Sequence, residues 1–540
     1  MTIGDKIAHL RISSRISQEA LAEKLGVSRQ SISKWELGEA LPQLNKVALI
    51  CDIFGVSSDE LINDNEDLSV KEEATTQNCM DIKNKYFGTD GFRGEANKDL
   101  TSYQAYRVGR FIGWYYSKIK TNKRARIIIG KDTRRSSYML EYSIIAGITA
   151  SGGDAYMLHV TTTPSVSYIT RCDEFDCGVM ITASHNPFYD NGIKIINSYG
   201  EKLDDKTASL IEAYIDGDLK RLNIDGDDIP FAKRENIGKI VDYTAGRNRY
   251  VGYLISIASH SYKNLRIGLD CANGASWSIA RAVFDALGAQ LYVTGCSPDG
   301  LNINNGVGST HIENLISLVK ENHLDIGFAF DGDADRCMAV DENGNVVDGD
   351  CILYILSLRL KERGALNHNK LVATIMSNTG LFDALDKVGI EYEKTTVGDR
   401  FVYECMQNNS YTLGGEQSGH IILKKYATTG DGILTALMIT EELCDKKSTL
   451  SNLARPVTLY PQITKSVYVK SKDEVMEDEE INAALNDITA EINGKGRILL
   501  RKSGTEPVIR IMAECISEKK CNEYINTLYE IMKRKGYTVE

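Results

Sequence analysis

The sequence predicts an α/β protein in which three similar α/β domains and a C-terminal α+β domain surround a central cleft, preceded by a small all-α domain. Three observations predict this fold. The chain has 540 residues, which is too long for one hydrophobic core. Three segments repeat the order strand, polar loop, helix, strand. Residues 5–63 instead show only helical periodicity, and the part after residue 460 follows a different order of elements.

The composition is that of an ordinary globular protein, with 42% hydrophobic and 25% charged residues. The net charge is −11, so nucleic acid or a membrane could be bound only by a local surface. The 12 cysteines have no metal-ligand spacing, and no stretch has the length of a membrane span or the apolar core of a signal peptide. We therefore expect a cytoplasmic protein with reduced thiols and no membrane partner.

Residues 5–63 predict five short helices. Apolar side chains recur there at helical spacing, namely Ile7, Leu10, Leu21, Leu25, Ile32, Trp35, Leu49 and Phe54. Ser17 and Ser28 stand where they can cap the second and third helices. We expect a helical domain over residues 1–65 and a polar, aperiodic linker over residues 66–82.

The run SQEALAEKLGVSRQSISKWELG resembles the phage-repressor type of helix-turn-helix domain. In that family the second helix of the motif enters the major groove of DNA. The resemblance implies that the base-reading positions are Ser28, Arg29, Gln30 and Lys34. Basic residues outnumber acidic ones only slightly in this region, so a domain that mediates association alone is the alternative.

The repeated α/β unit begins at Ala125, Leu265 and Lys370. Each copy starts with an apolar β-rich run and passes through a polar loop and a helix into a second strand. This order is typical of parallel sheets. We expect the three units in domains over residues 83–238, 239–340 and 341–457, followed by the α+β domain over residues 458–540.

Two loops carry residue types suited to phosphoryl chemistry. Ser184 follows an apolar strand and precedes a His-Asn-Pro turn, which favours an exposed nucleophile, with a capping serine as the alternative. The carboxylates of Asp331, Asp333 and Asp335 alternate along a short loop and predict a Mg²⁺ site. An EF-hand loop is the competing interpretation. Here, however, glycine directly follows the first aspartate and a β-strand precedes the loop, and neither feature fits an EF-hand.

Two further loops carry groups suited to a sugar phosphate. Residues 414–420, GGEQSGH, combine carboxylate and hydroxyl groups for sugar hydroxyls with glycines that allow close approach. Residues 501–507, RKSGTEP, together with Arg510 supply cations, hydroxyls and backbone amides for a phosphate. Read singly, each loop could be an exposed polar turn. Together with YFGTDGFRG at residues 86–94, they predict an enzyme of sugar phosphates.

With these five motifs in this order, residues 83–540 resemble the α-D-phosphohexomutase superfamily, and within it the phosphoglucosamine mutase branch. The resemblance implies that a phosphorylated Ser184 holds Mg²⁺ together with Asp331, Asp333 and Asp335. It implies that the sugar hydroxyls are bound by Glu416 and Ser418. It implies that the phosphate that does not react is bound by Arg501, Ser503, Gly504, Thr505 and Arg510. It implies that Arg93, Lys194 and His420 assist proton transfer or charge stabilisation at the reacting phosphate. It implies that His185 and Arg336 occupy nearby positions of the active site.

The resemblance also implies an activity. It is the interconversion of a hexose 6-phosphate and a hexose 1-phosphate, through a phosphoserine and a sugar bisphosphate that serves as intermediate and activator. Glucosamine 6-phosphate is the leading substrate, and phosphoglucomutase or phosphomannomutase activity is the alternative. A DNA-binding regulator that senses sugar phosphates with its mutase body is a further alternative, although no catalytic group is missing. A homodimer is left open.

Overall fold

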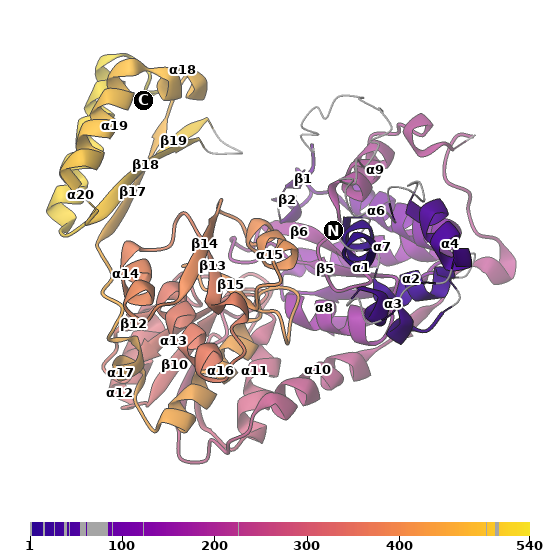
Figure 1. Cartoon of the computed structure of the whole chain (residues 1–540), viewed down its shortest axis with the longest axis horizontal. Coiled ribbons are helices and arrows are strands. Elements are labelled where there is room, and N and C mark those ends of the chain that lie inside the picture. Colours follow the sequence, from indigo (N-terminus) through magenta and orange to yellow (C-terminus); the bar gives the residue numbers. More distant parts are fainter. Residues whose placement is uncertain are drawn as a thin grey trace. The chain divides into compact units, whose positions relative to one another are not determined.

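The structure, a computed structural model, describes residues 3–13, 17–25, 27–36, 40, 42, 44–54, 61, 85–88, 90–121, 124–224, 226–492, 494–502 and 507–539. The chain forms two compact units, Met1–Lys83 and Asn84–Glu540 (Figure 1). None of the described helices is long and apolar enough to cross a membrane.

The N-terminal unit is helical. Its described elements are α1 (Ile3–Ser13), α2 (Gln18–Leu25), α3 (Arg29–Glu36) and α4 (Leu44–Phe54). Both predicted serine caps are present: Ser17 Oγ accepts the Ala20 N–H at 3.0 Å, and Ser28 Oγ accepts the Ser31 N–H at 3.2 Å. The segment expected to form a fifth helix falls mostly outside the described residues.

The core of this unit follows the predicted apolar pattern with one exception. Six members of that pattern are buried, namely Ile7, Leu10, Leu21, Leu25, Ile32 and Trp35, and Phe54 is partly buried against them. Leu49 is instead 40% exposed, and Val47 and Ile50 of the same helix are buried. The expectation for Leu49 was wrong because α4 presents the face that carries Val47 and Ile50, three residues apart, to the other helices.

The first sheet of the larger unit has seven strands in the order β1-β2-β6-β5-β3-β4-β7. Their bounds are β1 (Phe87–Gly88), β2 (Gly91–Glu95), β3 (Arg126–Lys131), β4 (Asp154–Val160), β5 (Cys177–Ile181), β6 (Asp190–Asn197) and β7 (Ile240–Asp242). Both faces of the central strand β3 are covered. Ile127 and Ile129 pack into one core cluster and Ile128 into another. This is why the sequence reads as a continuous apolar run there.

Helices cover the two faces of this sheet. Those whose buried side chains join the Ile127 cluster are α6 (Ser102–Tyr115), α7 (Arg135–Ala150) and α9 (Asp205–Ile215). The opposite face packs on α8 (Thr163–Cys172). After the π-helix Tyr116–Thr121 and the 3₁₀ turns Lys220–Leu222 and Arg234–Asn236, α10 (Thr244–Ile257) leads out of the domain.

The second and third sheets share one core cluster. The second contains β8 (Arg266–Asp270), β9 (Gln290–Thr294), β10 (Ile326–Phe330), β11 (Cys337–Asp341) and β12 (Val346–Val347), with α11 (Ser276–Ala286) and α12 (Glu313–Glu321). The third contains β13 (Lys370–Thr374), β14 (Glu391–Thr395), β15 (Leu413–Gly415) and β16 (Ile421–Leu423). Its helices are α13 (Gly349–Glu362), the 3₁₀ turn Asn367–Asn369, α14 (Thr379–Lys387), α15 (Asp399–Asn408), α16 (Gly432–Lys446) and α17 (Leu450–Ala454).

The three sheets contain the same four-strand arrangement. In each, a central strand pairs in parallel with the two strands that follow it, and the last of these pairs with an antiparallel fourth strand. The antiparallel pairs are β5 with β6, β10 with β11, and β15 with β16. The loop between these two strands carries, in turn, Ser184, the three aspartates and the predicted sugar loop. Three of the four predicted loops therefore occupy equivalent places in their sheets.

The C-terminal domain has a three-stranded antiparallel sheet in the order β17-β19-β18. Its elements are β17 (Gln462–Tyr468), α18 (Lys472–Glu477), α19 (Glu479–Ile492), β18 (Gly496–Lys502), β19 (Val508–Cys515) and α20 (Glu518–Arg534). It is the predicted α+β domain. The predicted phosphate loop lies between β18 and β19, and its Ser503, Gly504 and Thr505 fall outside the described residues.

Candidate active site

Ser184 lies in the turn after β5 with its backbone in the left-handed region, at φ +52°. Left-handed backbone is unfavourable for residues other than glycine and marks a position that the surrounding structure enforces. The side chain is buried, and Ser184 Oγ donates a hydrogen bond of 2.5 Å to Asp331 Oδ2. Nδ1 of His185 lies 3.4 Å from the same oxygen. The predicted nucleophile therefore contacts the predicted metal loop directly.

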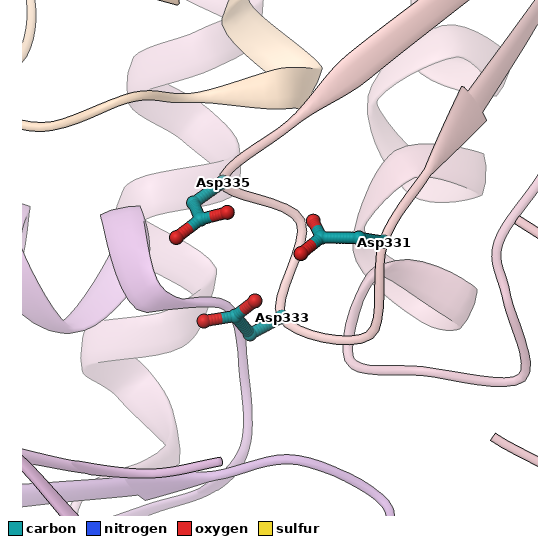
Figure 2. Close-up of side chains that lie close together, drawn as sticks. All are labelled: Asp331, Asp333 and Asp335. Carbon is teal, nitrogen blue, oxygen red and sulfur yellow. The ribbon is translucent and has the colours of Figure 1, made fainter. Parts of the chain in front are cut away.

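The three aspartates converge. Asp331, Asp333 and Asp335 are buried, and each offers a carboxylate oxygen within 4.8 Å of the others (Figure 2). Oδ1 of Asp333 and Oδ1 of Asp335 accept no hydrogen bond from the described residues. Burial and the two neighbouring carboxylates hold the pKa of Asp331 well above its usual range. Two unsatisfied buried carboxylate oxygens in a cluster of three carboxyl groups fit a hard divalent cation.

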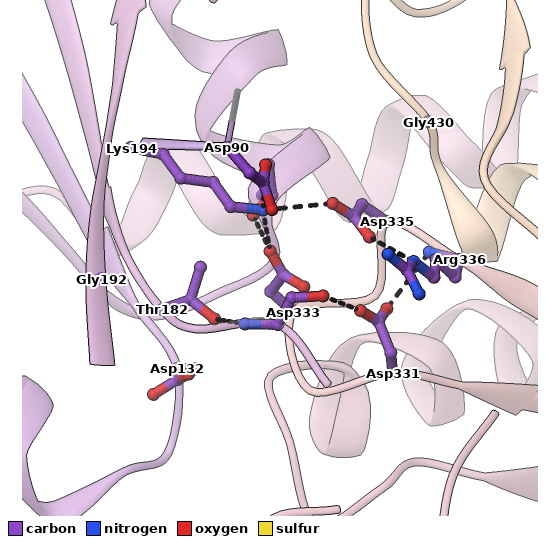
Figure 3. Close-up of polar contacts among 12 residues, drawn as sticks. Asp90, Asp132, Thr182, Gly192, Lys194, Asp331, Asp333, Asp335, Arg336 and Gly430 are labelled. Carbon is purple, nitrogen blue, oxygen red and sulfur yellow. Dashed lines mark hydrogen bonds and ion pairs between the residues drawn. The ribbon is translucent and has the colours of Figure 1, made fainter. Parts of the chain in front are cut away.

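Lys194 on β6 balances part of this charge. Its Nζ lies 2.8 Å from Asp333 Oδ2, 3.2 Å from Asp335 Oδ2 and 3.4 Å from Asp90 Oδ1 (Figure 3). Burial acts to lower the pKa of Lys194, but these carboxylates raise it well above its ordinary value, so the side chain is a cation. Arg93 forms an ion pair with Asp90 and so lies next to the same group.

A closed ring of ion pairs and close polar contacts joins the first three domains. Around it, each group faces the next in the order Lys194, Asp335, His420, Asp399, Lys202 and Asp90. Lys202 Nζ lies 3.0 Å from Asp90 and 2.6 Å from Asp399. Burial acts to raise the pKa of Asp90, but Lys194, Lys202 and Arg93 lower it, so its carboxylate is ionised. The ring connects the sugar loop to the aspartate cluster.

Two side chains of the predicted sugar loop accept hydrogen bonds from backbone N–H groups of neighbouring segments. Glu416 Oε1 accepts the Gly398 N–H at 3.0 Å, and Ser418 Oγ is buried without a hydrogen-bond partner among the described residues. His420 Nε2 accepts the Gly430 N–H at 2.9 Å. Because that nitrogen is an acceptor, the ring proton belongs on Nδ1, which lies 3.8 Å from Asp335 Oδ1.

The remaining predicted residues fall in two places. Arg336 donates its backbone N–H to Asp331 at 3.2 Å, within the aspartate loop. Arg501 and Arg510 lie on the sheet of the C-terminal domain, directly opposite each other on β18 and β19. Burial and the neighbouring Arg510 lower the pKa of Arg501. Two opposed guanidinium groups repel each other, and an anion between them would relieve that repulsion.

The sequence did not identify several residues that shape this site. Asp90 lies inside the motif YFGTDGFRG and Asp399 is the last residue of the third repeat, so both belong to segments that the sequence had marked. No pattern marked Thr163 on α8, whose Oγ1 donates to Asp333 Oδ2 at 2.5 Å. The same holds for Arg134 and Asn304, which bind the backbone of the Ser184 loop. Their roles depend on contacts between domains that sequence spacing does not encode.

Comparison with known proteins gives five matched regions. The description "Phosphoglucomutase/phosphomannomutase" fits residues 84–221 as alpha/beta/alpha domain I and residues 248–344 as domain II. It fits residues 348–460 as domain III and residues 466–531 as the C-terminal domain. The description "Helix-turn-helix" fits residues 7–61.

Individual proteins agree with these regions. A phosphoglucosamine mutase from Lachnospira eligens is 58% identical over 455 residues, which cover 84% of this chain and 100% of that protein. One from Bacillus cereus is 47% identical over 449 residues, covering 83% and 98%. The crystal structure of a phosphoglucomutase/phosphomannomutase family protein from Burkholderia thailandensis has a TM-score of 0.70 at 22% identity, over 84% of this chain and 98% of that one.

Proposed function

Because the chain belongs to the phosphoglucomutase/phosphomannomutase family, it is a phosphohexomutase, and we propose that it interconverts glucosamine 6-phosphate and glucosamine 1-phosphate. Two relatives named phosphoglucosamine mutase, at 58% and 47% identity over nearly their whole length, support this substrate. The observation that carries the proposed role of Ser184 is the 2.5 Å hydrogen bond from its Oγ to the buried aspartate cluster.

Mg²⁺ is the cation that we assign to the aspartate cluster. Asp331, Asp333 and Asp335 would hold it, and the unsatisfied oxygens of Asp333 and Asp335 are available as ligands. When bound, the cation supplies positive charge for phosphoryl oxygens.

The reaction begins from phosphorylated Ser184. The phosphoryl group passes to the free hydroxyl of the bound sugar phosphate, so the bond from phosphorus to Ser184 Oγ breaks as the bond to the sugar oxygen forms. The sugar hydroxyl loses its proton, and we assign the receipt or relay of that proton to the groups around His420. Lys194 and Arg93 stabilise the charge that spreads over the phosphoryl oxygens during transfer.

The sugar bisphosphate formed in this way then turns end for end, and Ser184 Oγ takes back the other phosphoryl group. In this half-reaction the bond from that phosphorus to the sugar oxygen breaks as the bond to Ser184 Oγ forms. Ser184 Oγ, which takes up a proton when its own phosphoryl group leaves, gives that proton up, and the released sugar oxygen takes up a proton. In the unphosphorylated chain the Ser184 proton points to Asp331. Glu416 and Ser418 would bind the sugar hydroxyls in both orientations. Arg501, Ser503, Gly504, Thr505 and Arg510 would hold whichever phosphate is not reacting.

Assays with glucosamine, glucose and mannose 6-phosphates, each with Mg²⁺ and a trace of hexose 1,6-bisphosphate, test the substrate. We expect the largest kcat/KM for the amino sugar. Ser184→Ala should abolish turnover, and a chelator should abolish that of the unaltered chain until Mg²⁺ is restored. Interconversion that persists in the Ser184→Ala chain would refute the mechanism, and a preference for glucose or mannose would refute the substrate.

DNA binding is a second function that we propose, for the N-terminal unit. Ser28, Arg29, Gln30 and Lys34 are exposed along the start and one face of α3, whereas Ile32 and Trp35 of the same helix are buried. The match of residues 7–61 to helix-turn-helix domains supports this assignment. Arg29 and Gln30 have the hydrogen-bonding groups that suit guanine and adenine. A homodimer would present two such helices to two half-sites.

Gel shifts with the full chain and a library of duplexes, at a stated salt concentration, test this function. We expect a bound duplex whose affinity falls as salt rises. Arg29→Ala with Gln30→Ala should remove sequence preference, whereas Lys24→Ala, a change of an exposed cation on α2, should not. If no duplex is retained at low salt, the unit serves another purpose, and light scattering would report whether it holds two chains together.

A further inference from the structure

The backbone of the Ser184 loop is held by two buried side chains. The Ser184 carbonyl accepts hydrogen bonds from Arg134 Nη2 at 2.9 Å and from Asn304 Nδ2 at 2.8 Å. The Asn186 carbonyl accepts from the same two groups, at 2.9 and 3.1 Å. Arg134 Nη1 also donates to the Pro187 carbonyl at 2.5 Å. Two side chains thus bind three backbone carbonyls of this loop, those of residues 184, 186 and 187.

These two donors come from different domains. Arg134 precedes α7 in the first domain, where Asp132 Oδ2 accepts from its Nε at 2.8 Å and fixes the guanidinium. Asn304 belongs to the loop that follows β9 in the second domain. Both side chains are almost fully buried, at 0% and 6% exposure. Solvent therefore does not compete for the hydrogen bonds, and each donor is oriented by its own domain.

The two domains are also joined beside the donors. Thr133 Oγ1 donates to the Asn273 carbonyl at 2.6 Å, and the Arg135 N–H donates to the Gly300 carbonyl at 3.0 Å. The residues on either side of Arg134 are therefore attached to the loop that carries Asn304 and to the loop after β8, whose Ala272 carbonyl accepts the Asn304 N–H at 2.9 Å. Arg134 and Asn304 are built into the contact between domains, and their position depends on that contact.

The Ser184 backbone needs such support. A left-handed conformation is unfavourable for a residue with a Cβ. That conformation accompanies the orientation in which Ser184 Oγ reaches Asp331 at 2.5 Å. The aspartate loop also packs tightly against the Ser184 backbone, because a Cβ on Gly332 would lie 2.4 Å from the Ser184 carbonyl oxygen. A small relaxation of the loop would therefore separate the nucleophile from the aspartates.

We propose that Asn304 and Arg134 are positioning residues for Ser184: they hold its carbonyl from two domains and thereby aim its side-chain oxygen at the aspartate cluster. This inference rests on the proposed role of Ser184 as the phosphorylated group. Through Asn304, which lies outside the aspartate loop, the second domain helps to place the nucleophile. The clamp made by Asn304 and Arg134 acts on the phosphorylation step and leaves the sugar loop untouched.

Asn304→Gly is the informative variant. Asn304 itself has a left-handed backbone, at φ +58°, which glycine adopts without strain, so the change removes the amide and adds no charge. Asn305→Gly, at the exposed neighbouring position, is the matched control. Asn304→Asp is a second variant, since aspartate also tolerates this backbone but offers oxygen where the carbonyls need a donor.

Two measurements on the full chain test the clamp. The first is the rate at which the intact mass gains one phosphoryl group from hexose 1,6-bisphosphate. The second is kcat and KM with glucosamine 6-phosphate. We expect both Asn304 variants to lose about tenfold or more in phosphorylation rate and in kcat, with KM within about twofold, because misplaced reacting groups slow the chemical step. The Asn305→Gly chain should behave as the unaltered one, and the thermal midpoints of all three variants should agree.

Phosphorylation of the Asn304→Gly chain at the unaltered rate would overturn the inference. So would a loss of rate that goes with an equal rise in KM and a lower thermal midpoint, because that pattern belongs to general destabilisation. The Ser184→Ala chain distinguishes a failure of the proposed mechanism from a failure of the clamp alone. If that chain still turns over, the proposed mechanism fails and the clamp with it. If it is inactive while Asn304→Gly is normal, only the clamp is wrong.

Discussion

At the scale of single residues, Lys202 forms ion pairs with one carboxylate of the first domain and one of the third, beside the active site. Its Nζ lies between Asp90, which pairs with Arg93, and Asp399, which lies 3.6 Å from His420. Burial acts to lower the pKa of Lys202, and the two carboxylates raise it, so the side chain is a cation held between two anions. Lys202 therefore supports catalytic groups on both sides of the ring.

Replacement of Lys202 by methionine should leave Asp90 and Asp399 without their shared cation. We expect kcat/KM to fall about tenfold or more, because partners that orient catalytic groups commonly contribute that much. Lys202→Arg should restore most of the activity, and Lys206→Met, at an exposed neighbouring lysine, should change little. Steady-state kinetics decides this, and equal activities for the two methionine variants would contradict it.

At the scale of elements, α6 and α7 of the first domain pack closely against each other. It depends on glycine: a Cβ on Gly109 would lie 2.2 Å from the Ile144 carbonyl oxygen, and one on Gly147 would lie 2.2 Å from the Tyr106 carbonyl oxygen. Carbonyl oxygens belong to the helix backbone and cannot rotate away. The two helices must separate if either glycine gains a side chain.

Gly109→Ala should therefore lower the thermal midpoint, at a cost of about 1–3 kcal/mol or more from overpacking. Gly252→Ala is the matched control on α10, since nothing lies within 4 Å of the Cβ that it would add. Alanine favours a helix over glycine by about 0.5–1 kcal/mol, so this control should be neutral or stabilising. Calorimetry of both chains measures the difference, and similar losses in both would contradict the packing argument.

The carboxyl group at the N-cap of α16 should make the free energy of unfolding depend on pH. Burial raises the pKa of its N-cap residue Asp431 from 3.8 to about 6, against the hydrogen bonds from the Leu434 N–H and Tyr250 OH. The folded chain therefore keeps this proton to higher pH than the unfolded chain does. It follows that the contribution of Asp431 to stability falls as pH rises from about 4 to about 6.

Asp431→Asn keeps a good N-cap and removes that titration. Relative to the unaltered chain, we expect the variant to gain stability between about pH 4 and about pH 7.5. Denaturation curves for both chains at the two pH values test this. A difference between the chains that stays constant with pH would show that Asp431 does not titrate in this range.

At the scale of the whole molecule, the C-terminal domain is attached to the third domain by the two members of an ion pair on its own sheet, each of which also bonds to backbone of the third domain. Arg497 lies 3.2 Å from Glu514, which is fully buried. Arg497 also donates to the Ile375 and Ser377 carbonyls, and Glu514 accepts the Thr379 N–H at 2.8 Å. The domain that carries Arg501 and Arg510 is therefore attached through groups that are satisfied only when both domains are in place.

Arg497→Ala would leave the Glu514 carboxylate buried without its cation, a loss that typically costs about 3–5 kcal/mol. We expect the C-terminal domain to unfold or detach at lower temperature, with faster proteolysis in the segment before β17. Arg534→Ala breaks an exposed pair with Glu480 in the same domain and should have little effect. Limited proteolysis and calorimetry of the two variants make the comparison.

The sequence was most informative where one short segment carries the signal. Ser17 and Ser28 cap helices because the cap and the bonded N–H groups lie within three residues. The alternation of Asp331, Asp333 and Asp335 turned three carboxylates to one side of a loop. Leu49 was misjudged because a short amphipathic helix offers two overlapping faces, and only its neighbours select one of them.

By itself, the sequence determined the order of the domains and the chemistry of each loop, because apolar periodicity and motif composition are local properties. Only the tertiary structure decided that three of those loops occupy equivalent turns of three similar sheets. It also decided that Lys202 and Asn304 reach the active site from other elements. The physical reason is that such contacts form when separate domains pack against each other. The spacing of residues along the chain does not specify which residues of different domains come close together.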